Sequence, residues 1–582
     1  MRIETNYSII NKYNYNQKIV KRPTFRAIPD PILTAGAVSI ISVLAAGYVK
    51  ILETLNIGAE RMDDIKNFEK LRSALETKAE PLEHKAKILD WDFYTDSTQE
   101  NMQKMQEAWD KCSALYKNHK TFEKFKLIDS SKLNKHDSKQ LKDILRIFDD
   151  ELFTGDLKKS LRDKESEIAQ KYNSYVPTLD GKEISKADIT QLLQTEKNPQ
   201  IRENVLEAKI KGGDLIADDL IDFVKMRNEF AKTKGYDNFF EYNLKEIYDV
   251  DANYLEKLID EVYTRAKDKI KLIQDKNQSE LKEFFKVDEL KPYHYGLILD
   301  SNPTKVVNDI LEKLSKENSY IIEELSKKTY EGMGYDIEEL KQEGKLTLDL
   351  YPRKNKNTHG FCFGIDSGKD ARILANLKNN AYALDTLNHE MGHCIHHLGV
   401  STELPYFDRA DVPSALTEAI AMMMGDIIKR ENVLKDILPE DKLKKFKSSF
   451  SKDEANFVAK SLLIIDFERN LYKNPEQDPK VLWRDLSKKY LNTDSGLTNE
   501  WATIPHYLSH PAYYQNYFRA TIMKAQIYNH LREKLGNITE NKESAKYLTD
   551  NIFKYGCSLD EHDLIKQLTG KELSAEDFVK NL

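Results

Sequence analysis

The chain has 582 residues, which is enough for several ordinary domains or one large helical body with an extensive core. Its 89 Lys and Arg nearly balance its 96 Asp and Glu, so the formal net charge is only −7 and a nucleic-acid partner is not expected. The cysteines form no CxxC pair and indicate neither a disulfide framework nor a thiolate zinc knuckle: Cys112, Cys362, Cys394 and Cys557.

Residues 1–50 differ from the rest of the chain and form an amino-terminal extension. Within them, residues 32–49 carry no charged side chain and follow a basic stretch, which is typical of an export signal or a membrane anchor. The run is at the short limit for a bilayer span, and small and hydroxyl residues dilute its hydrophobicity, so a helix packed on the body is the alternative. Both interpretations stay open, with a membrane-anchored or exported protein placed before a cytoplasmic one.

Residues 51–582 have the sequence pattern of long charged helices. Apolar positions recur every three or four residues, for example in 65–91 and 252–273, which predicts a mainly α body. Turn clusters separate the helices, but no internal repeat and no clear domain linker appear. We therefore expect residues 51–582 to be one helical domain, and the protein to be a monomer.

Residues 345–377 are an exception to this helical pattern. They contain three short segments of strand character, KLTLDLY, HGFCFGI and ARILANL, separated by polar loops. The sequence thus predicts one small β-sheet, which directly precedes a histidine-rich segment.

That segment, 387–397, reads LNHEMGHCIHH. If residues from about 383 to 398 form a helix, His389 and His393 lie one turn apart on one face and can reach a single cation, with Glu390 beside them. This is the HExxH arrangement. The alternative is a pair of helix histidines with ordinary hydrogen bonds, and a pair of His393 with His397 would lack a glutamate placed as base. We expect His396 and His397 to be packing or supporting residues and Cys394 to be a buried thiol.

A catalytic zinc usually keeps three protein ligands and one open position, so a third donor is needed. The extended HExxHxxGxxH pattern would need Gly at 396 and His at 399, and the chain has the reverse. Glu418 follows His393 by 25 positions in DVPSALTEAIAMMMGD, where Pro413 suits a helix start. A carboxylate among Ala, Ile and Met is costly unless it is paired or metal-bound, which predicts Glu418 as the third ligand rather than a solvent-facing residue.

These residues resemble a known family. The stretch 359–393 is similar to the active-site region of angiotensin-converting enzyme and the bacterial dipeptidyl carboxypeptidases, and the likeness continues through Glu418–Ile420. The segment WATIPHYLSHPAYYQNYF (501–518) is similar to oligoendopeptidase F and thimet oligopeptidase, and RNEFAKTKGYDNFFEY (227–242) is a weaker match. Together they cover, with interruptions, most of residues 85–525, and the region 359–426 is the most specific part.

The resemblance implies a helical, two-lobed clamshell zincin with interleaved lobes, a deep central channel and a small sheet beside the active-site helix. It implies Zn²⁺ held by His389, His393 and Glu418, with Glu390 as general base. By position, the resemblance also implies an edge strand that pairs with the substrate backbone, formed by His359, Gly360 and Phe361. It implies that His506 and Tyr517 hydrogen-bond the tetrahedral intermediate, with His510 and Tyr514 as possible substitutes.

Three positions depart from the family pattern. Met422 stands where angiotensin-converting enzyme has a carboxylate, so we expect Asp411, with Asp426 behind it, to support the metal ligands. Ile504 stands where the family has the lysine that anchors a peptide carboxylate, and Asn516 stands where it has a chloride-binding arginine. Release of carboxy-terminal dipeptides is therefore in doubt, and chloride activation is not expected.

The sequence predicts a zinc-dependent peptidase for short unfolded oligopeptides. One alternative is a strict peptidyl-dipeptidase. Another, of a different class, is an inactive peptide-binding helical scaffold with a structural zinc. Glu390 distinguishes the peptidase from the inactive scaffold, because a purely structural zinc site needs no base beside its ligand.

Overall fold

The computed structural model describes residues 64–582 except 154, 155, 358 and 411. The predicted apolar segment 32–49 and the predicted supporting residue Asp411 therefore lie outside the described residues. Within that part of the chain, no helix combines the length and the apolarity that a bilayer crossing requires.

Helices dominate the described chain, as the sequence predicts. The first group comprises α2 (Asp64–Thr95), α3 (Gln99–Tyr116), α4 (His119–Lys126), α5 (Lys135–Leu152), α6 (Asp156–Ser174), α7 (Lys186–Thr195), α8 (Pro199–Asp214), α9 (Ala217–Thr233) and α10 (Phe239–Tyr242). The second comprises α11 (Ala252–Phe285), α12 (Pro303–Ser315), α13 (Ile321–Met333) and α14 (Ile337–Gln342).

The carboxy-terminal half carries the segments that were predicted to be functional. Its helices are α15 (Ala381–Gly399), α16 (Tyr406–Arg409), α17 (Ser414–Arg430), α18 (Glu440–Ser448), α19 (Phe450–Lys473), α20 (Pro479–Leu491), α21 (His506–Ser509), α22 (Tyr514–Leu535), α23 (Glu543–Asn551), α24 (Glu561–Thr569) and α25 (Glu576–Asn581). A 3₁₀ turn, η5 (Glu500–Thr503), leads into α21.

The starts of α15 and α17 follow from local chemistry. The Asn380 side chain accepts a hydrogen bond from the Ala383 backbone N–H and so caps α15. Helix α17 begins at Ser414, directly after Pro413, as the sequence predicts. Both helices are buried over most of their length, which puts their polar side chains in the interior.

Three strands form a sheet in the predicted region: β3 (Leu346–Asp349), β4 (Phe361–Asp366) and β5 (Asp370–Leu374). Strand β5 lies in the middle, parallel to β3 and antiparallel to β4, with Phe361 opposite Leu374. β4 is therefore an edge strand of this sheet. A two-stranded hairpin, β1 (Thr178–Leu179) and β2 (Lys182–Glu183), adds a second sheet that the sequence indicated only as a turn.

Two large hydrophobic cores hold the helices together. One contains α13, α15, α17 and the sheet, with Leu384 as a fully buried example. The other contains α9, α11, α19 and α20, with Phe467 as an example. Helix α22 contributes to both, because Met523 lies in the first core and Ile522 in the second. The two cores give the mainly α fold two lobes, whereas the deep channel between them stays a prediction.

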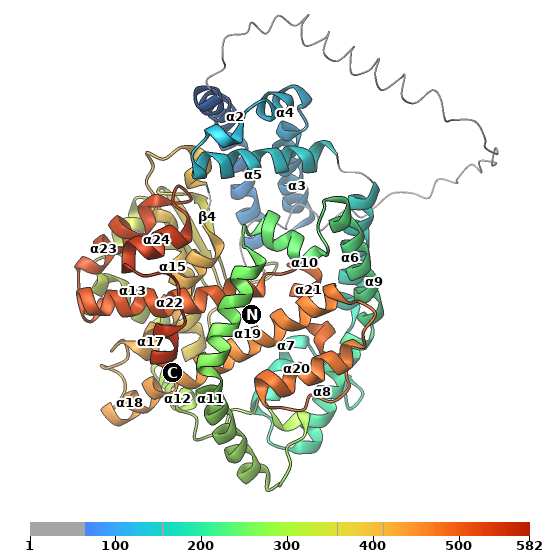
Figure 1. Ribbon diagram of the computed structural model, residues 1–582. Coiled ribbons are helices and arrows are strands. Elements are labelled where there is room, and N and C mark those ends of the chain that lie inside the picture. Colours follow the sequence, from blue (N-terminus) through green and yellow to red (C-terminus); the bar gives the residue numbers. More distant parts are fainter. Residues whose placement is uncertain (1–63, 154–155, 358, 411) are drawn as a thin grey trace, which may run out of the picture.

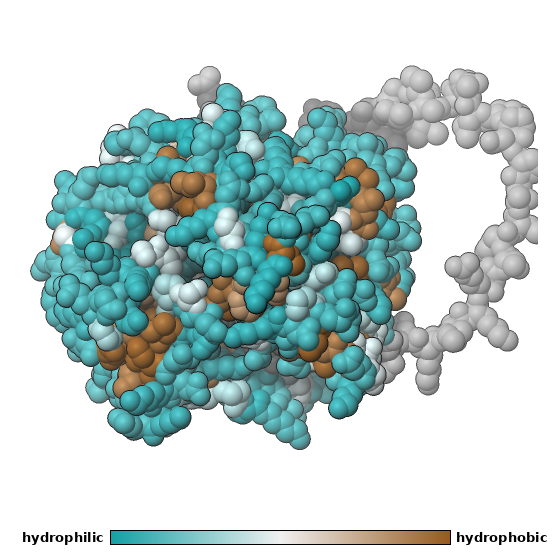
Figure 2. Space-filling model, turned by 90° about the horizontal axis from the view of Figure 1, so that it is seen from below, coloured by the Kyte–Doolittle hydropathy of each residue, from teal (hydrophilic) through white to brown (hydrophobic). Residues whose placement is uncertain are grey.

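Figure 1 shows this division: α13, α15, α17 and α24 group on one side, α6 to α9 and α20 on the other, and α2 to α5 above. Figure 2 shows that the face seen from below is mostly hydrophilic, with several separate hydrophobic patches.

Helix α2 closes one face of the sheet. Its Trp91 packs edge-on against Phe363 of β4, with ring centroids 5.5 Å apart, and Tyr94 packs against Phe361 at 5.3 Å. The opposite face of β4 meets α15. The edge strand is therefore held between an amino-terminal helix and the histidine-bearing helix.

Candidate metal centre

Helices α15 and α17 cross in close contact at Gly392. A β-carbon at Gly392 would lie 2.9 Å from the Cα of Ala421 and 3.1 Å from the Cβ of Met424. Such distances are closer than ordinary packing, so only glycine lets the two backbones approach this far. The glycine stands between the two histidines of HEMGH and fixes how near α17 comes to them.

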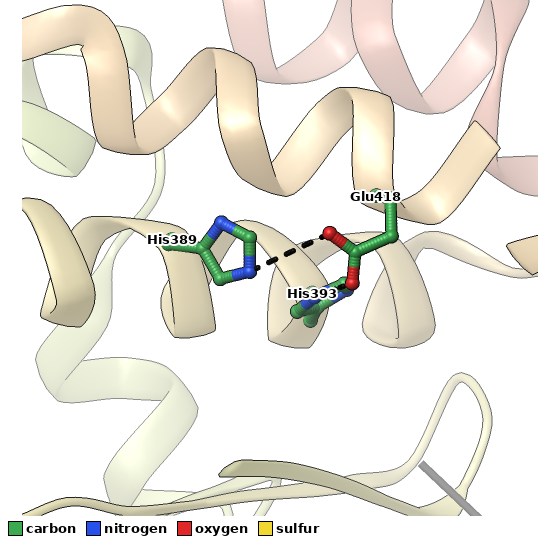
Figure 3. A group of neighbouring side chains, drawn as sticks. All are labelled: His389, His393 and Glu418. Atoms are coloured by element: carbon green, nitrogen blue, oxygen red, sulfur yellow. Dashed lines mark ion pairs between the residues drawn. The ribbon is translucent and has the colours of Figure 1, made fainter. Parts of the chain in front are cut away.

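The crossing brings three predicted ligands together (Figure 3). Both imidazole rings come from α15 and face the carboxylate of Glu418 from α17. His389 Nε2 lies 3.9 Å from Glu418 Oε2, and His393 Nε2 lies 3.4 Å from Glu418 Oε1. The His389 and Glu418 side chains are almost fully buried, and that of His393 is 12% exposed.

This donor set fits a divalent metal ion. A tetrahedral zinc with bonds of about 2.0–2.2 Å holds its donor atoms roughly 3.3–3.6 Å apart. The three potential ligand atoms lie within 4.8 Å of one another, so small side-chain adjustments reach that spacing. Two imidazoles and one carboxylate leave a fourth position open, as in catalytic rather than structural zinc sites.

Thr417 orients one of the imidazoles, which the sequence analysis missed. Its hydroxyl Oγ1 lies 2.9 Å from His393 Nδ1, so the ring presents Nε2 to Glu418 when Nδ1 carries the proton and donates to the hydroxyl. Thr417 directly precedes Glu418 on α17, and a carboxylate was expected in this role. No sequence signal separates this threonine from an ordinary helix residue.

Asp426, the carboxylate expected behind Asp411, contacts a lysine. It forms an ion pair with Lys524 of α22, and the same Lys524 Nζ lies 2.7 Å from Glu454 Oε1 of α19. The ammonium is fully buried, so the two carboxylates compensate its charge and tie α17, α19 and α22 together. The structure gives Asp426 this role in packing.

Glu390 lies beside the beginning of the edge strand. A β-carbon at Gly360 would be 3.8 Å from Glu390 Oε1 and 3.3 Å from the Thr386 methyl group. The backbone just before β4 therefore approaches the carboxylate that follows His389 in the sequence. The hydroxyl of buried Tyr330 donates to the Asn388 carbonyl at 2.5 Å and holds this turn of α15 from the other side.

Successive side chains of β4 point alternately toward α2 and toward α15. Phe361 belongs to the cluster under α2, so its side chain is a packing residue. Cys362 faces α15, where its Sγ lies 2.9 Å from that of Cys394, and all four cysteines are free thiols. His359 precedes the strand, and its backbone N–H donates to Asn357 Oδ1 at 2.9 Å.

The two extra histidines of the motif are packing residues. His396 is fully buried and stacks on Phe553, with ring centroids 4.8 Å apart. His397 packs against Gly364 of β4, and its Nδ1 lies 3.3 Å from Ser367 Oγ. Burial lowers the pKa of His397 to about 3, so this ring is neutral near pH 7. Cys394 is buried, as predicted.

An aromatic cluster surrounds His506. Its ring lies 4.8 Å from that of Tyr514 and 6.1 Å from that of Tyr517, measured between centroids, while Tyr513 is 5.1 Å from Tyr517. Burial, together with the charges of His510 and Lys460, lowers the pKa of His506 to about 3. His506 is therefore neutral near pH 7 and can donate one hydrogen bond without carrying charge.

The two proposed substitutes lie in the same cluster. His510 Nδ1 is 2.7 Å from Ser509 Oγ, and its ring centroid is 5.9 Å from that of His506. Tyr514 is half-buried, and desolvation raises the pKa of its phenol to about 12, so the hydroxyl keeps its proton. The structure thus brings His506, His510, Tyr514 and Tyr517 together.

Contacts from distant parts of the chain fix the loop that carries this cluster. Arg227 of α9 donates to the carbonyl oxygens of Tyr507, at 2.7 Å, and Leu508, at 2.5 Å. The buried carboxyl of Glu468 accepts the N–H of Ala512, which has the left-handed φ of 60°. Arg227, the first residue of the RNEF stretch, and Glu468 thus position the segment around His506.

Comparison with known proteins assigns the chain to a family. A family model described as peptidase family M3 matches residues 192–582, which is well over half of the chain and includes the whole candidate centre. The chain belongs to peptidase family M3. A second model, described as angiotensin-converting enzyme, matches residues 62–269, which contain none of the predicted site residues.

Individual members of the family are distant relatives. The chain is 24% identical to oligopeptidase PepF of Bacillus subtilis over 373 residues, which is 60% of this chain and 52% of that protein. It is 23% identical to an oligoendopeptidase F homolog of Borreliella burgdorferi over 423 residues, 68% of this chain and 66% of that one. Saccharolysin of Saccharomyces cerevisiae is 21% identical over 443 residues, 62% of this chain and 60% of that one. The matches thus span between half and two thirds of these relatives' lengths.

We predict that Gly392→Ala weakens metal binding. Glycine to alanine in a helix ordinarily gains about 1 kcal/mol. Here the added methyl group meets the α17 backbone, and such overpacking costs about 1–3 kcal/mol. We expect at least a tenfold loss of Zn²⁺ affinity in competition with a chromophoric chelator, and no gain in the thermal stability of the metal-free protein. A stabilised variant with unchanged affinity would contradict the close crossing.

We predict that Thr417→Val lowers Zn²⁺ affinity by about 10–100-fold, because His393 loses its supporting hydroxyl. The two side chains have the same shape, so packing is preserved, and Thr417→Ser is the matched control that keeps the hydroxyl. Chelator competition on all three proteins checks this. Equal affinities for the valine and serine variants would show that the hydroxyl does not support the ligand.

Proposed function

We propose that the protein is a zinc-dependent peptidase that hydrolyses peptide bonds in short, unfolded oligopeptides. The observation that carries the proposal is the convergence of His389, His393 and Glu418, with Glu390 next to a ligand and beside the backbone that leads into an edge strand. Membership of peptidase family M3 and the names of the relatives, oligopeptidase and oligoendopeptidase, support peptide bonds as the target.

The edge strand supports an extended substrate. β4 pairs with β5 along one side only, so its other side offers backbone donors and acceptors to a peptide in strand conformation. A folded protein rarely presents a free extended strand, whereas an unfolded oligopeptide does. A peptide laid along the beginning of β4 passes the Glu390 carboxylate, which is 3.8 Å from where a Gly360 side chain would begin.

His389, His393 and Glu418 would hold the zinc ion. When bound, zinc supplies Lewis-acid chemistry, which polarises the peptide carbonyl and lowers the pKa of a coordinated water to about 7. Glu390 then acts as the base: its carboxylate accepts a proton from the attacking water and donates that proton to the leaving amine. Its position directly after a ligand keeps it at the reacting atoms.

His506 and Tyr517 would donate hydrogen bonds to the oxygen of the scissile carbonyl as negative charge develops there. Neutral His506 offers one N–H, and the phenol of Tyr517 offers its O–H. Arg227 and Glu468 hold the backbone around them, so these donors need little reorganisation during the reaction.

We expect Glu390→Gln to keep one zinc ion per chain and to lose about 10²–10⁴ of its kcat, because the amide has the same shape but cannot accept the proton. Metal analysis and hydrolysis of a peptide mixture, followed by mass spectrometry, check both points. His389→Ala is the companion variant, for which we expect loss of stoichiometric zinc. Unchanged turnover in Glu390→Gln, or full zinc in His389→Ala, would refute the mechanism.

We expect Tyr517→Phe to lower kcat by about 10²–10³ with little change in KM, since the hydroxyl acts on the transition state. Tyr514→Phe is the matched comparison, because Tyr514 contacts the same histidine ring. If the large loss appears in Tyr514→Phe instead, the two tyrosines exchange roles. If neither variant loses kcat, no tyrosine of this cluster stabilises the intermediate.

A further inference from the structure

Lys460 lies on the face of α19 that looks toward the His506–Tyr517 segment. Three positions earlier, the Phe457 ring packs edge-on against Tyr517 with a centroid distance of 6.3 Å. Four positions later, the Ile464 carbonyl accepts a hydrogen bond from the Tyr507 hydroxyl at 3.3 Å. Residues spaced by three and four share one side of a helix. Lys460 therefore stands between two contacts to the segment that carries His506.

The Lys460 side chain is exposed, and among the described residues it has no carboxylate within ion-pair distance. Its neighbour Lys209 differs, because Lys209 Nζ lies 2.7 Å from Glu500 Oε1. Glu500 belongs to η5, which leads directly into α21 and His506. The region around η5 thus contains the Lys209–Glu500 ion pair and, in addition, the ammonium group of Lys460.

The charge of Lys460 acts on the groups that surround it. Desolvation, and then the charge of Lys209, lower the pKa of Lys460, although its side chain is exposed. The same ammonium contributes to the lowered pKa of His506, which places it within electrostatic reach of that ring.

We propose that Lys460 binds a carboxylate of the peptide substrate close to the scissile bond. The inference rests on the proposed peptidase function and adds the substrate class: peptides with a negative charge near the bond that is cut. The carboxylate has two sources, a free carboxy terminus or an aspartate or glutamate side chain, and both offer the same oxygen pair to the ammonium. A charge-assisted hydrogen bond from this ammonium to a carboxylate is stronger than a hydrogen bond between neutral groups.

This role differs from that of His506 and Tyr517. Those groups face the oxygen that changes charge during the reaction, whereas Lys460 would meet a charge that is the same in substrate and transition state. Its contribution therefore appears in kcat/KM through KM, with a smaller effect on kcat. It is also sensitive to ionic strength, because salt screens an ion pair that water can reach.

The experiment uses the full chain loaded with zinc and one peptide family of a single parent sequence. The members are the peptide with a free carboxy terminus, the same peptide as an amide, and longer amidated peptides with Glu, Gln or Lys at the formerly terminal position. Mass spectrometry maps the cut, and kcat/KM is measured for each. We expect the carboxylate and Glu peptides to exceed the amide and Gln peptides by at least tenfold at low salt.

The variants are Lys460→Met and Lys460→Glu, with Lys452→Met as the control. Lys452 lies on the same helix, and its Nζ donates to Asn277 Oδ1 at 2.7 Å. We expect Lys460→Met to reduce the carboxylate-to-amide ratio at least tenfold and Lys460→Glu to favour the Lys peptide over the Glu peptide. Lys452→Met should keep the wild-type ratio. A preference gained by Lys460→Glu cannot arise from misfolding.

Two outcomes would contradict the inference. A wild-type enzyme that cuts all members equally, or a ratio that is unchanged in Lys460→Met, shows that this lysine does not read a carboxylate. Preference for the free terminus without preference for Glu limits the anchor to carboxy termini and supports a peptidyl-dipeptidase. Preference for both supports an endopeptidase that selects acidic positions. If the wild-type protein cuts no peptide at all, the proposed function itself fails, and the inference with it.

Discussion

The close crossing of α15 and α17 is the constraint on which the candidate centre depends. Because Gly392 has no side chain, α15 and α17 pack closely together, and Glu418 lies beside both imidazoles. Three polar groups in an apolar core would otherwise be unfavourable, because each must be desolvated. A metal ion would compensate all three of these costs at once, since it would bind the carboxylate and both imidazole nitrogens. The apolar surroundings that make Glu418 unusual also make the cation favourable.

A second level of organisation connects this centre to the rest of the molecule. Helix α22 lies in both hydrophobic cores, and Lys524 on it joins carboxylates from α17 and α19. Tyr517, a member of the cluster that surrounds His506, is on the same helix. The proposed transition-state donors are therefore set by contacts between the two lobes, whereas the metal ligands are set within one. Arg227 strengthens this division, because it acts on the His506 loop from 280 positions away.

The sequence predicted the features that depend on local periodicity. His389, Glu390 and His393 follow from helical spacing alone, Glu418 follows from a carboxylate in an apolar helix, and the three strands follow from their composition. Features that depend on tertiary contact were not predictable. Thr417 is an ordinary helix residue until α17 meets α15. Asp426 was expected behind Asp411 in support of the ligands, whereas its ion pair is with Lys524, almost 100 positions later. The burial of Phe361 under α2 likewise needs a helix from the other end of the chain.

The predicted metal ligands lie close together in the sequence, and this affects how the site forms during folding. His389 and Glu418 are 29 positions apart and belong to consecutive long helices, so bringing them together closes only a short loop and costs little chain entropy. The groups around His506 also need α9, whose Arg227 contacts the Tyr507 carbonyl across 280 positions, and contacts of that range form slowly. The fold therefore predicts that, if the centre binds zinc as proposed, the α15–α17 pair can hold the ion before the groups around His506 are in place. Metal binding and catalytic competence would then arise as separate events during folding.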